Sequence, residues 1–444
     1  MLPERLTLQP IARFSGTLVL PGSKSLSNRI LLLSALAGGE TEVTGVLESE
    51  DTEVMLAALR RLGIAIRGAP GQGSLWIRGA GGPLDAPDSG SKPAGQADPA
   101  APIELFLGNA GTAMRPLTAV LAAGRGSFVL KGVARMHERP IGDLVEGLRQ
   151  LGAHIACLEH EGYPPLRIEG AGLSGGTARI SGATSSQFLS ALLLAAPLAR
   201  GPVTVELADR LVSEPYVDMT LALMARYGVR VGRPAALRFE IAAPQRYVSP
   251  GRVLVEGDAS SASYFLAGAA ITGGKVRVEG CGSDSLQGDA RFADMLERMG
   301  ARIRFEPAAI EVEGQGRLQG IDADLTAMPD AAMTLAVAAL FAHGPTTLRG
   351  IANWRVKETD RMAAVSTELG KLGARTEVGP DTLVVHPPER IRPATIATYN
   401  DHRMALAFSL AACGGEPVVI ENPACVGKTF PAYFDELRHL TVPR

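Results

Sequence analysis

Apolar segments that open on small polar residues recur along the whole chain of 444 residues. These segments occupy residues 21–39, 109–126, 182–201, 257–274, 329–344 and 400–415. Each one starts with residues such as Ser, Thr, Asn, Asp or Gly and continues into a run rich in Ala and Leu. Small polar residues cap helix N-termini, and a helix that is apolar on most faces must be buried. The pattern therefore predicts six buried helices.

A second, more polar helix and short strands accompany each buried helix. The second helices contain the runs MLAALRRLG, LVEGLRQLG, LALMARYG, MLERMG, STELGKLG and FDELRHL. Alternating runs such as KVRVEG and TTLRGI are typical of strands. Most starts are about 70–75 residues apart, which is the length of a βαβ-type unit. The sequence thus predicts an α/β protein built from six repeated units.

Two globular domains of three units each are expected rather than a solenoid, because the apolar helices need cover on most faces. We expect one domain from residues 1–21 plus 256–444 and the other from residues 22–255. The chain then crosses twice between the domains, which makes a two-strand hinge. Residues 81–102 are rich in Pro, Gly, Ala and Asp and have no periodicity, so they are expected to form an exposed insertion.

Composition and charge narrow the classes of function. The formal net charge is -2 and aromatic residues make up 5%, so nucleic acid is not an expected partner. No apolar run reaches the about 20 residues that span a bilayer, and the N-terminus has no leader pattern, so a cytoplasmic protein without a membrane partner is expected. Four cysteines without a CxxC pair indicate reduced thiols, and the seven scattered histidines predict no metal site.

The stretch Leu20–Arg29, LPGSKSLSNR, is similar in composition to a nucleotide-binding P-loop. A P-loop needs Gly immediately before its lysine, whereas Ser23 precedes Lys24 here. Two interpretations remain for this stretch alone. It is either a helix cap with a solvated lysine or an anion site that uses the N–H groups of a helix start.

Cations recur at the other helix starts and in neighbouring loops. They are Lys24, Arg29, Arg115, Arg139, Lys357, Arg361, Arg403 and Lys428. Singly, each has an ordinary explanation, such as an exposed helix start with local ion pairs. Together, in a chain of net charge -2, they predict a site for a multiply charged anion that carries phosphate and carboxylate groups. Asp330 and Glu358 stand in the same motifs and are the candidates for proton transfer.

The motifs resemble one family when they are taken in order. They are LPGSKSLSNR, LFLGNAGTAMRP, SSQFL, DRLVSEPY, EGDASSASYF, PDAAMT, NWRVKETDR, YNDHRMA and KTFPAYF, from about Leu6 to Phe434. This series resembles the 5-enolpyruvylshikimate-3-phosphate synthase family. The resemblance implies the enolpyruvyl transferase fold: two inside-out α/β domains, each of three βαβαββ repeats, which close on substrate.

The resemblance also implies a transferase of the shikimate pathway, which leads through chorismate to the aromatic amino acids. The enolpyruvyl group of phosphoenolpyruvate passes to the 5-hydroxyl of 3-phosphoshikimate by addition and elimination. Phosphate is released, and no cofactor takes part. The family analogy further implies a monomer.

Residues are assigned by the motifs that they share with the family. For 3-phosphoshikimate these are Lys24, Ser25, Arg29, Ser185, Ser186, Gln187, Ser213, Tyr216, Asp330, Asn353 and Lys357. For phosphoenolpyruvate they are Lys24, Asn109, Gly111, Thr112, Arg139, Gln187, Arg361, Arg403 and Lys428. The resemblance implies Asp330 as the base toward the 5-hydroxyl and Glu358 as the acid near C3 of phosphoenolpyruvate. Lys24 would contact both substrates, and its charge would stabilise the leaving phosphate.

Alternatives remain at this stage. Gly111, Thr112 and Pro116 match the glyphosate-sensitive form of their motif, so inhibition by glyphosate in competition with phosphoenolpyruvate is expected. The nearest rival is the sister enolpyruvyl transferase acting on UDP-N-acetylglucosamine, which uses a loop cysteine as acid. No cysteine here lies in a matching loop. A non-catalytic anion-binding scaffold is the alternative from another class. Which carboxylate serves the addition and which the elimination stays open.

Overall fold

The computed structural model describes residues 2–87 and 101–444, and the chain divides into two compact units. Unit 1 consists of Met1–Ser23 and Glu256–Arg444, and unit 2 consists of Lys24–Val255. The first boundary follows Ser23, two residues after the expected one. The Ser23 N–H donates to the Glu256 carbonyl at 2.8 Å, which joins the two segments of unit 1. Residues 88–100, which make up most of the expected insertion, lie outside the described residues.

Unit 2 contains three sheets of the same strand order. Its helices are α1 (Lys24–Leu36), α2 (Glu50–Arg61), α3 (Gly111–Ala123), α4 (Ala134–His137), α5 (Gly142–Gln150), α6 (Ser186–Ala195) and α7 (Glu214–Arg226). Its strands are β3 (Glu40–Thr44), β4 (Ala65–Arg67), β5 (Ser74–Arg78), β6 (Ile103–Phe106), β7 (Arg125–Lys131), β8 (His154–Cys157), β9 (Leu166–Ala171), β10 (Gly176–Ile180), β11 (Val203–Leu207), β12 (Gly232–Ala235), β13 (Arg238–Ile241) and β14 (Arg252–Leu254). The sheets run β14-β3-β5-β4, β6-β7-β9-β8 and β10-β11-β13-β12.

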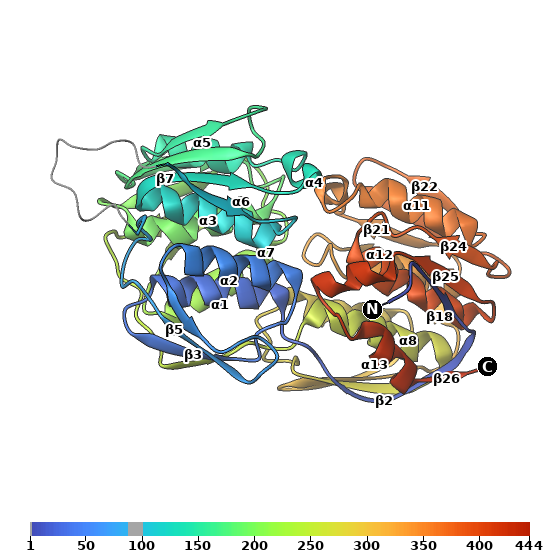
Figure 1. Cartoon of the computed structure of the whole chain (residues 1–444). Helices are drawn as coiled ribbons and strands as arrows, with labels where there is room; N and C mark the ends of the chain where they lie inside the picture. Colours follow the sequence, from blue (N-terminus) through green and yellow to red (C-terminus); the bar gives the residue numbers. More distant parts are fainter. Residues whose placement is uncertain (1, 88–100) are drawn as a thin grey trace, which may run out of the picture. The chain divides into compact units, whose positions relative to one another are not determined.

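Each of these sheets corresponds to one βαβαββ repeat. The first two strands of a sheet are parallel, and the other neighbours are antiparallel. In the second and third sheets the six elements follow one another along the chain. The first sheet differs, because the residues before α1 belong to unit 1. Its leading strand is instead β14, from the end of the unit. In Figure 1, β3 and β5 of this sheet run along α1 and α2.

Unit 1 repeats the same plan. Its helices are α8 (Ala259–Thr272), α9 (Phe292–Arg298), α10 (Ala332–Ala338), α11 (Arg361–Lys371), α12 (His402–Phe408) and α13 (Tyr433–Leu440). Its strands are β1 (Arg5–Leu8), β2 (Ile11–Val19), β15 (Lys275–Glu279), β16 (Arg302–Glu306), β17 (Ala309–Glu313), β18 (Leu318–Gln319), β19 (Asp322–Asp324), β20 (Ala342–His343), β21 (Thr346–Arg349), β22 (Arg375–Val378), β23 (Thr382–His386), β24 (Ala394–Ile396), β25 (Val418–Glu421) and β26 (Thr441–Pro443). The main sheets run β16-β17-β15-β2-β26, β19-β21-β23-β22 and β1-β25-β24.

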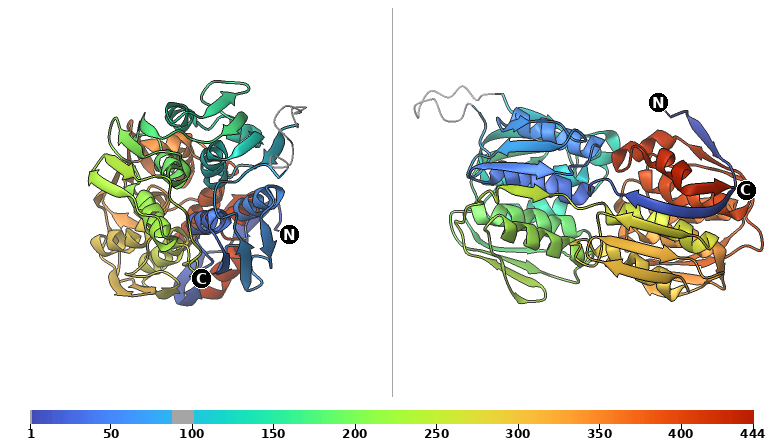
Figure 2. Two further views of the ribbon diagram at one scale, coloured as in Figure 1. Left: turned by 90° about the vertical axis from the view of Figure 1, so that its left-hand side faces the viewer. Right: turned by 90° about the horizontal axis from the view of Figure 1, so that it is seen from below.

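The last repeat of unit 1 is completed by the start of the chain. Strand β24 pairs in parallel with β25, and β1 from near the N-terminus pairs antiparallel with β25. Strand β26 joins the sheet of β2 instead. Both ends of the chain therefore belong to unit 1, as Figure 2 shows. The predicted α/β class and the repeated βαβαββ plan are confirmed. One strand of the first repeat, β14, is supplied from the end of unit 2. The sheet of the last repeat has three strands, one of them β1 from near the start of the chain, because β26 pairs with β2.

The first helix of each repeat is buried almost all round, as the sequence predicts. Every residue of α10 and of α12 is buried, and α1 is buried at every position except Ser25. Such helices are stable only inside a unit, so packing fixes the position of their first residues. Within the described part of the chain, no helix combines the length and the apolarity needed to cross a membrane.

Candidate active site

Lys24 and Arg29 are buried cations at the start of α1 in unit 2. The Lys24 Nζ lies 3.5 Å from Asp51 Oδ2, and the Lys24 side chain is 10% exposed. The Arg29 Nε donates to Thr220 Oγ1 at 2.8 Å, and its Nη1 donates to the Ser25 carbonyl at 3.0 Å. Burial lowers the pKa of Arg29 to about 10, so the guanidinium stays charged at neutral pH. Lys24 is therefore not the solvated lysine of a plain helix cap.

The hydroxyl-rich motifs of unit 2 lie at the starts of α6 and α7. The first of them supplies Ser185, Ser186 and Gln187, and the Ser185 side chain caps α6 by accepting from the Gln187 N–H at 3.2 Å. Ser213 precedes α7 with φ 54°, a left-handed backbone that non-glycine residues rarely adopt. The Arg29 Nη2 donates to the Tyr216 carbonyl at 3.4 Å. Arg29 therefore joins the starts of α1 and α7.

Two guanidinium groups surround the start of α3. The Arg139 Nη1 donates to both the carbonyl and the side-chain oxygen of Asn109, each at 3.0 Å. A Cβ atom at Gly111 would lie 2.6 Å from Arg115 Nη1 and 3.0 Å from Arg139 Nη2. Glycine at this position therefore leaves the space that the two guanidinium groups occupy.

Two residues that the sequence analysis did not select connect these groups. The Asn28 Nδ2 donates to Thr112 Oγ1 at 2.7 Å and so joins α1 to α3. Asp51, which faces Lys24, lies in the acidic first turn of α2. An acid in a first helical turn is common for reasons of helix stability alone, so its sequence context gives no sign of a role at a site.

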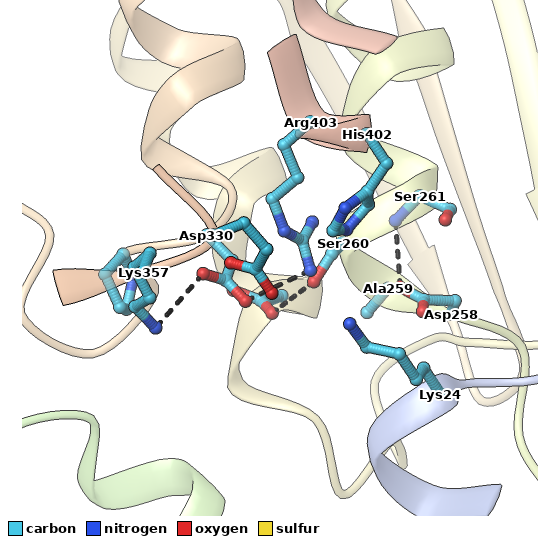
Figure 3. Close-up of polar contacts among 12 residues, drawn as sticks. Lys24, Asp258, Ala259, Ser260, Ser261, Asp330, Lys357, His402 and Arg403 are labelled. Carbon is cyan, nitrogen blue, oxygen red and sulfur yellow. Dashed lines mark hydrogen bonds and ion pairs between the residues drawn. The ribbon is translucent and has the colours of Figure 1, made fainter. Parts of the chain in front are cut away.

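In unit 1, Asp330 lies among three cations. Its Oδ1 is 2.8 Å from Arg361 Nη1 and 3.4 Å from Lys357 Nζ, and its Oδ2 is 3.0 Å from Arg403 Nη2. Figure 3 shows Asp330 between Lys357 and Arg403. The helix that follows has Ala331 at its N-cap and no side-chain cap, so Asp330 does not serve as its N-cap. Burial favours the neutral carboxyl, but the charges of Arg403, Lys357 and Arg361 outweigh it, so the pKa of Asp330 lies well below its usual range.

Arg361, the first residue of α11, is the centre of this ion-pair network. Its side chain is 1% exposed, its Nε donates to Asp401 Oδ2 at 2.7 Å, and its Nη2 donates to Glu358 Oε2 at 2.9 Å. Burial works against the charge, but Asp401, Glu358 and Asp330 together raise the pKa of Arg361 above its usual value. The motif NWRVKETDR is therefore not an exposed helix start. Asp401 was not selected from the sequence, because it also caps α12.

The remaining predicted residues of unit 1 lie in short 3-10 helices. Asn353 is buried in η4 (Ala352–Val356), and its Oδ1 has no hydrogen-bond partner among the described residues. The next residue, Trp354, donates its Nε1–H to the Pro329 carbonyl at 2.7 Å and so holds the segment that leads to Asp330. Lys428 is buried at the end of η6 (Pro423–Lys428).

Three helix starts meet in unit 1. The Arg403 Nη1 of α12 donates to Tyr264 Oη of α8 at 3.3 Å, and the hydroxyls of Ser263 in α8 and Thr334 in α10 are 2.7 Å apart. Burial raises the pKa of Tyr264 to about 12, so this phenol stays neutral. Helix N-termini carry partial positive charge, which adds to that of the arginines. This end of unit 1 is therefore suited to an anion and holds carboxylates that can move protons.

Metal ligands and reactive thiols are not part of these two groups of residues. Across residues 2–87 and 101–444, no cluster of three or more His, Cys, Asp or Glu side chains could hold a metal ion. Cys281 is buried, and burial raises the pKa of its thiol to about 12. The chemistry available in each group is that of cations, hydroxyls and carboxylates.

The fold defines the class of protein. The chain superposes on the enolpyruvyl transferase NikO from Streptomyces tendae with a TM-score of 0.77 at 19% identity, covering 99% of this chain and 98% of that one. It superposes on EPSP synthase from Acinetobacter baumannii with a TM-score of 0.79 at 28% identity, covering 99% and 98%. The architecture is therefore the enolpyruvyl transferase fold.

Sequence comparison identifies the family. The model of EPSP synthase (3-phosphoshikimate 1-carboxyvinyltransferase) matches residues 8–437. The chloroplastic 3-phosphoshikimate 1-carboxyvinyltransferase of Petunia hybrida is 53% identical over 447 residues, 98% of this chain and 85% of that protein. The 3-phosphoshikimate 1-carboxyvinyltransferase of Vibrio vulnificus (strain YJ016) is 52% identical over 438 residues, 99% of both chains. The chain belongs to the EPSP synthase family.

Proposed function

We propose that this protein transfers the enolpyruvyl group of phosphoenolpyruvate to the 5-hydroxyl of 3-phosphoshikimate and releases phosphate. The observation that carries the proposal is the placement of Asp330 within 3.4 Å of Arg361, Arg403 and Lys357 in a member of the EPSP synthase family. A reaction between two anionic substrates needs such a balance of cations and a proton acceptor.

The two substrates use overlapping sets of side chains in this proposal, because Lys24 and Gln187 are assigned to both. The cations assigned to the carboxylate and phosphate of phosphoenolpyruvate are Arg361, Arg403 and Lys428 in unit 1 and Arg139 in unit 2. Guanidinium groups suit this role, because they offer paired donors to both kinds of anion. The serines of α6, with Arg29 and Tyr216, act on 3-phosphoshikimate.

The proposed reaction is an addition followed by an elimination. Glu358 gives a proton to C3 of phosphoenolpyruvate while the 5-oxygen of 3-phosphoshikimate bonds to C2, and Asp330 takes the hydroxyl proton. The tetrahedral adduct then loses phosphate from C2, and one of the two carboxylates takes the proton from C3, which restores the double bond. Lys24 stabilises the charge on the departing phosphate. The acid and base are side chains, so each step needs only proton transfer and the two substrates.

The ion pairs of Asp330 connect substrate binding to its basicity. Arg361 and Arg403, assigned to phosphoenolpyruvate, are two of the three cations that hold the pKa of Asp330 down. When the substrate anion engages these arginines, less positive charge acts on the carboxylate, so its pKa rises toward the usual range. Asp330 therefore becomes a better base when phosphoenolpyruvate is bound.

The choice of acceptor tests the proposed function against the sister reaction. Purified protein is incubated with phosphoenolpyruvate and either 3-phosphoshikimate or UDP-N-acetylglucosamine, and the products are identified by mass spectrometry. We expect the enolpyruvyl ether of 3-phosphoshikimate alone. An enolpyruvyl ether of UDP-N-acetylglucosamine would identify the sister activity instead.

We further propose that glyphosate inhibits in competition with phosphoenolpyruvate, supported by Gly111, Thr112 and Pro116 at the start of α3. Glyphosate should raise the KM for phosphoenolpyruvate without lowering kcat, and undiminished turnover in saturating glyphosate would contradict this. We also infer a monomer that works in the cytoplasm. Sedimentation of the purified protein and fractionation of cells test these two points.

A further inference from the structure

Glu368 of α11 is a fully buried carboxylate that has no part in the steps above. Its side chain is 0% exposed. Its Oε1 accepts from Tyr399 Oη at 2.8 Å, and its Oε2 accepts from the Ala397 N–H at 3.2 Å. Lys371, one turn further along the same helix, places its Nζ 2.7 Å from Oε2. The buried charge is therefore paired, and two of its bonds go to a segment far along the chain.

That segment contains a left-handed turn. Tyr399 has φ 53° and Asn400 has φ 54°. A bulky residue such as tyrosine rarely adopts this conformation, and two in succession persist only where the surroundings hold them. The turn leads to Asp401, which binds Arg361. Arg361 and Glu368 lie on one face of α11, two helical turns apart. Arg361 binds Asp401, which follows the left-handed turn, and Glu368 binds Ala397, which precedes it.

The turn supports two cations that we assign to phosphoenolpyruvate. Helix α12 begins directly after it and carries Arg403, whose Nη2 is 3.0 Å from Asp330 Oδ2. The Asn400 Oδ1 accepts from Asn422 Nδ2 at 3.2 Å. Asn422, itself at φ 45°, is the N-cap of η6, which ends at Lys428. A single strained turn thus joins Glu368 to the elements that carry both cations.

We propose that Glu368 is a positioning residue for the phosphoenolpyruvate side of the site. By binding Ala397 and Tyr399 it keeps the turn left-handed, and the turn sets the starts of α12 and η6. When the carboxylate is replaced, the turn relaxes and the side chains of Arg403 and Lys428 move. The residues of unit 2 assigned to 3-phosphoshikimate keep their places. This inference rests on the proposed function, because it names the substrate that Glu368 serves.

The test is Glu368→Gln, assayed by phosphate release with each substrate varied in turn while the other saturates. We expect the KM for phosphoenolpyruvate to rise about tenfold, as for the loss of one buried charged hydrogen bond. The KM for 3-phosphoshikimate should stay within about twofold of that of the wild type. Equal rises in both KM values, a fall in kcat alone, or unchanged kinetics would each overturn the proposal.

Two further single variants control for general effects on folding. Ser366→Ala lies on the same helix, but its hydroxyl is 2.7 Å from Thr376 Oγ1 and does not contact the turn, so both KM values should be unchanged. Tyr399→Phe removes one bond to Glu368 at a side chain that is 42% exposed. Tyr399→Phe should raise the KM for phosphoenolpyruvate by a smaller factor than Glu368→Gln does. If Glu368→Gln does not fold, Tyr399→Phe becomes the test of the proposal. No rise in that KM overturns the proposal.

A double variant separates the shape of the turn from the charge of Glu368. Glycine adopts positive φ without strain, so Tyr399→Gly in the Glu368→Gln protein should restore part of the affinity for phosphoenolpyruvate. A double variant no better than Glu368→Gln means that charge and not geometry is responsible, which overturns the proposal. If the wild-type protein releases no phosphate, the proposed function fails and this inference falls with it. If the wild type is active and the variants keep its KM for phosphoenolpyruvate, only this inference fails.

Discussion

Asp330 contributes to the stability of unit 1 through its negative charge. Its pKa in the folded chain lies well below the value of about 3.9 expected when unfolded. A carboxylate whose pKa is lowered by folding stabilises the fold fully at pH values above its pKa in the unfolded chain. This contribution is lost as the pH falls through the lower pKa of the folded chain. We therefore expect Asp330→Asn to destabilise unit 1 by about 3 kcal/mol at pH 7 and by progressively less below about pH 4.

Urea unfolding at several pH values measures this effect. The chain has two tryptophans, so in a Trp76→Phe background the buried Trp354 of unit 1 reports alone. Asp218→Asn is the control of opposite sign. It lies in unit 2, so its effect is followed by hydrogen exchange of that unit and not by Trp354. Burial, and then the charge of Glu214, raise the pKa of Asp218, while Arg233 acts in the opposite direction. The wild-type protein should therefore lose stability relative to Asp218→Asn as the pH rises. If the free energies of unfolding of the wild type and Asp330→Asn differ by the same amount from pH 7 to below pH 4, the stabilising role of these ion pairs is contradicted.

Gly111 gives a second prediction at the residue scale. Alanine at this position would bring Cβ to 2.6 Å from Arg115 Nη1 and 3.0 Å from Arg139 Nη2, so the guanidinium groups must move. We expect Gly111→Ala to raise the KM for phosphoenolpyruvate about tenfold, the equivalent of a misplaced charged contact. Gly370→Ala is the matched control, because a Cβ there meets nothing within 4 Å. An unchanged KM in Gly111→Ala would contradict the assignment of Arg139 to that substrate.

The cations of the candidate site could be predicted from the sequence, but their acidic partners could not. Lys24 and Arg403 stand out because they are charged residues at the starts of otherwise apolar helices, and Arg361 because it stands in the cation-rich motif NWRVKETDR. Asp401 reaches Arg361 from 40 positions away, and its own motif is that of a helix cap. Contacts of this kind depend on packing between repeats, which no local pattern encodes.

At the scale of elements, α2 shows how a helix start places a side chain. Ser49 accepts from the Thr52 N–H, Thr52 accepts in return from the Ser49 N–H, and this capping box fixes the first turn that carries Asp51 beside Lys24. Ser49→Ala should destabilise the helix by about 1 kcal/mol, whereas Ser49→Thr should keep the cap. Hydrogen exchange of residues 50–61 measures the change. Exchange at the wild-type rate in Ser49→Ala would show that the cap is not needed.

The buried helices could be predicted from the sequence for a physical reason. The pairing of the strands into sheets could not be predicted in full. A helix such as α1 or α10 is apolar on nearly all faces, so its sequence shows that it lies inside a unit. The strands β14 and β1 complete sheets whose other members are far away along the chain. The short sequences of these two strands do not indicate which strand each one pairs with. Pairing between strands so far apart in the sequence depends on the packing of the whole unit.

At the scale of the molecule, the two units are interleaved along the chain. Unit 2 is inserted whole between Ser23 and Glu256 of unit 1, and β14 closes its first sheet just before the chain returns. The expected division of the sequence differs from these units only at residues 22 and 23. Since residues assigned to each substrate lie in both units, the proposed reaction requires both of them to be intact.

The most direct test of the account is phosphate release by the purified wild-type protein, given phosphoenolpyruvate and 3-phosphoshikimate together and each one singly. The account predicts release only when both substrates are present, and a loss of about a hundredfold or more in kcat for Asp330→Asn. Release from phosphoenolpyruvate alone, or no release with both substrates present, would contradict it.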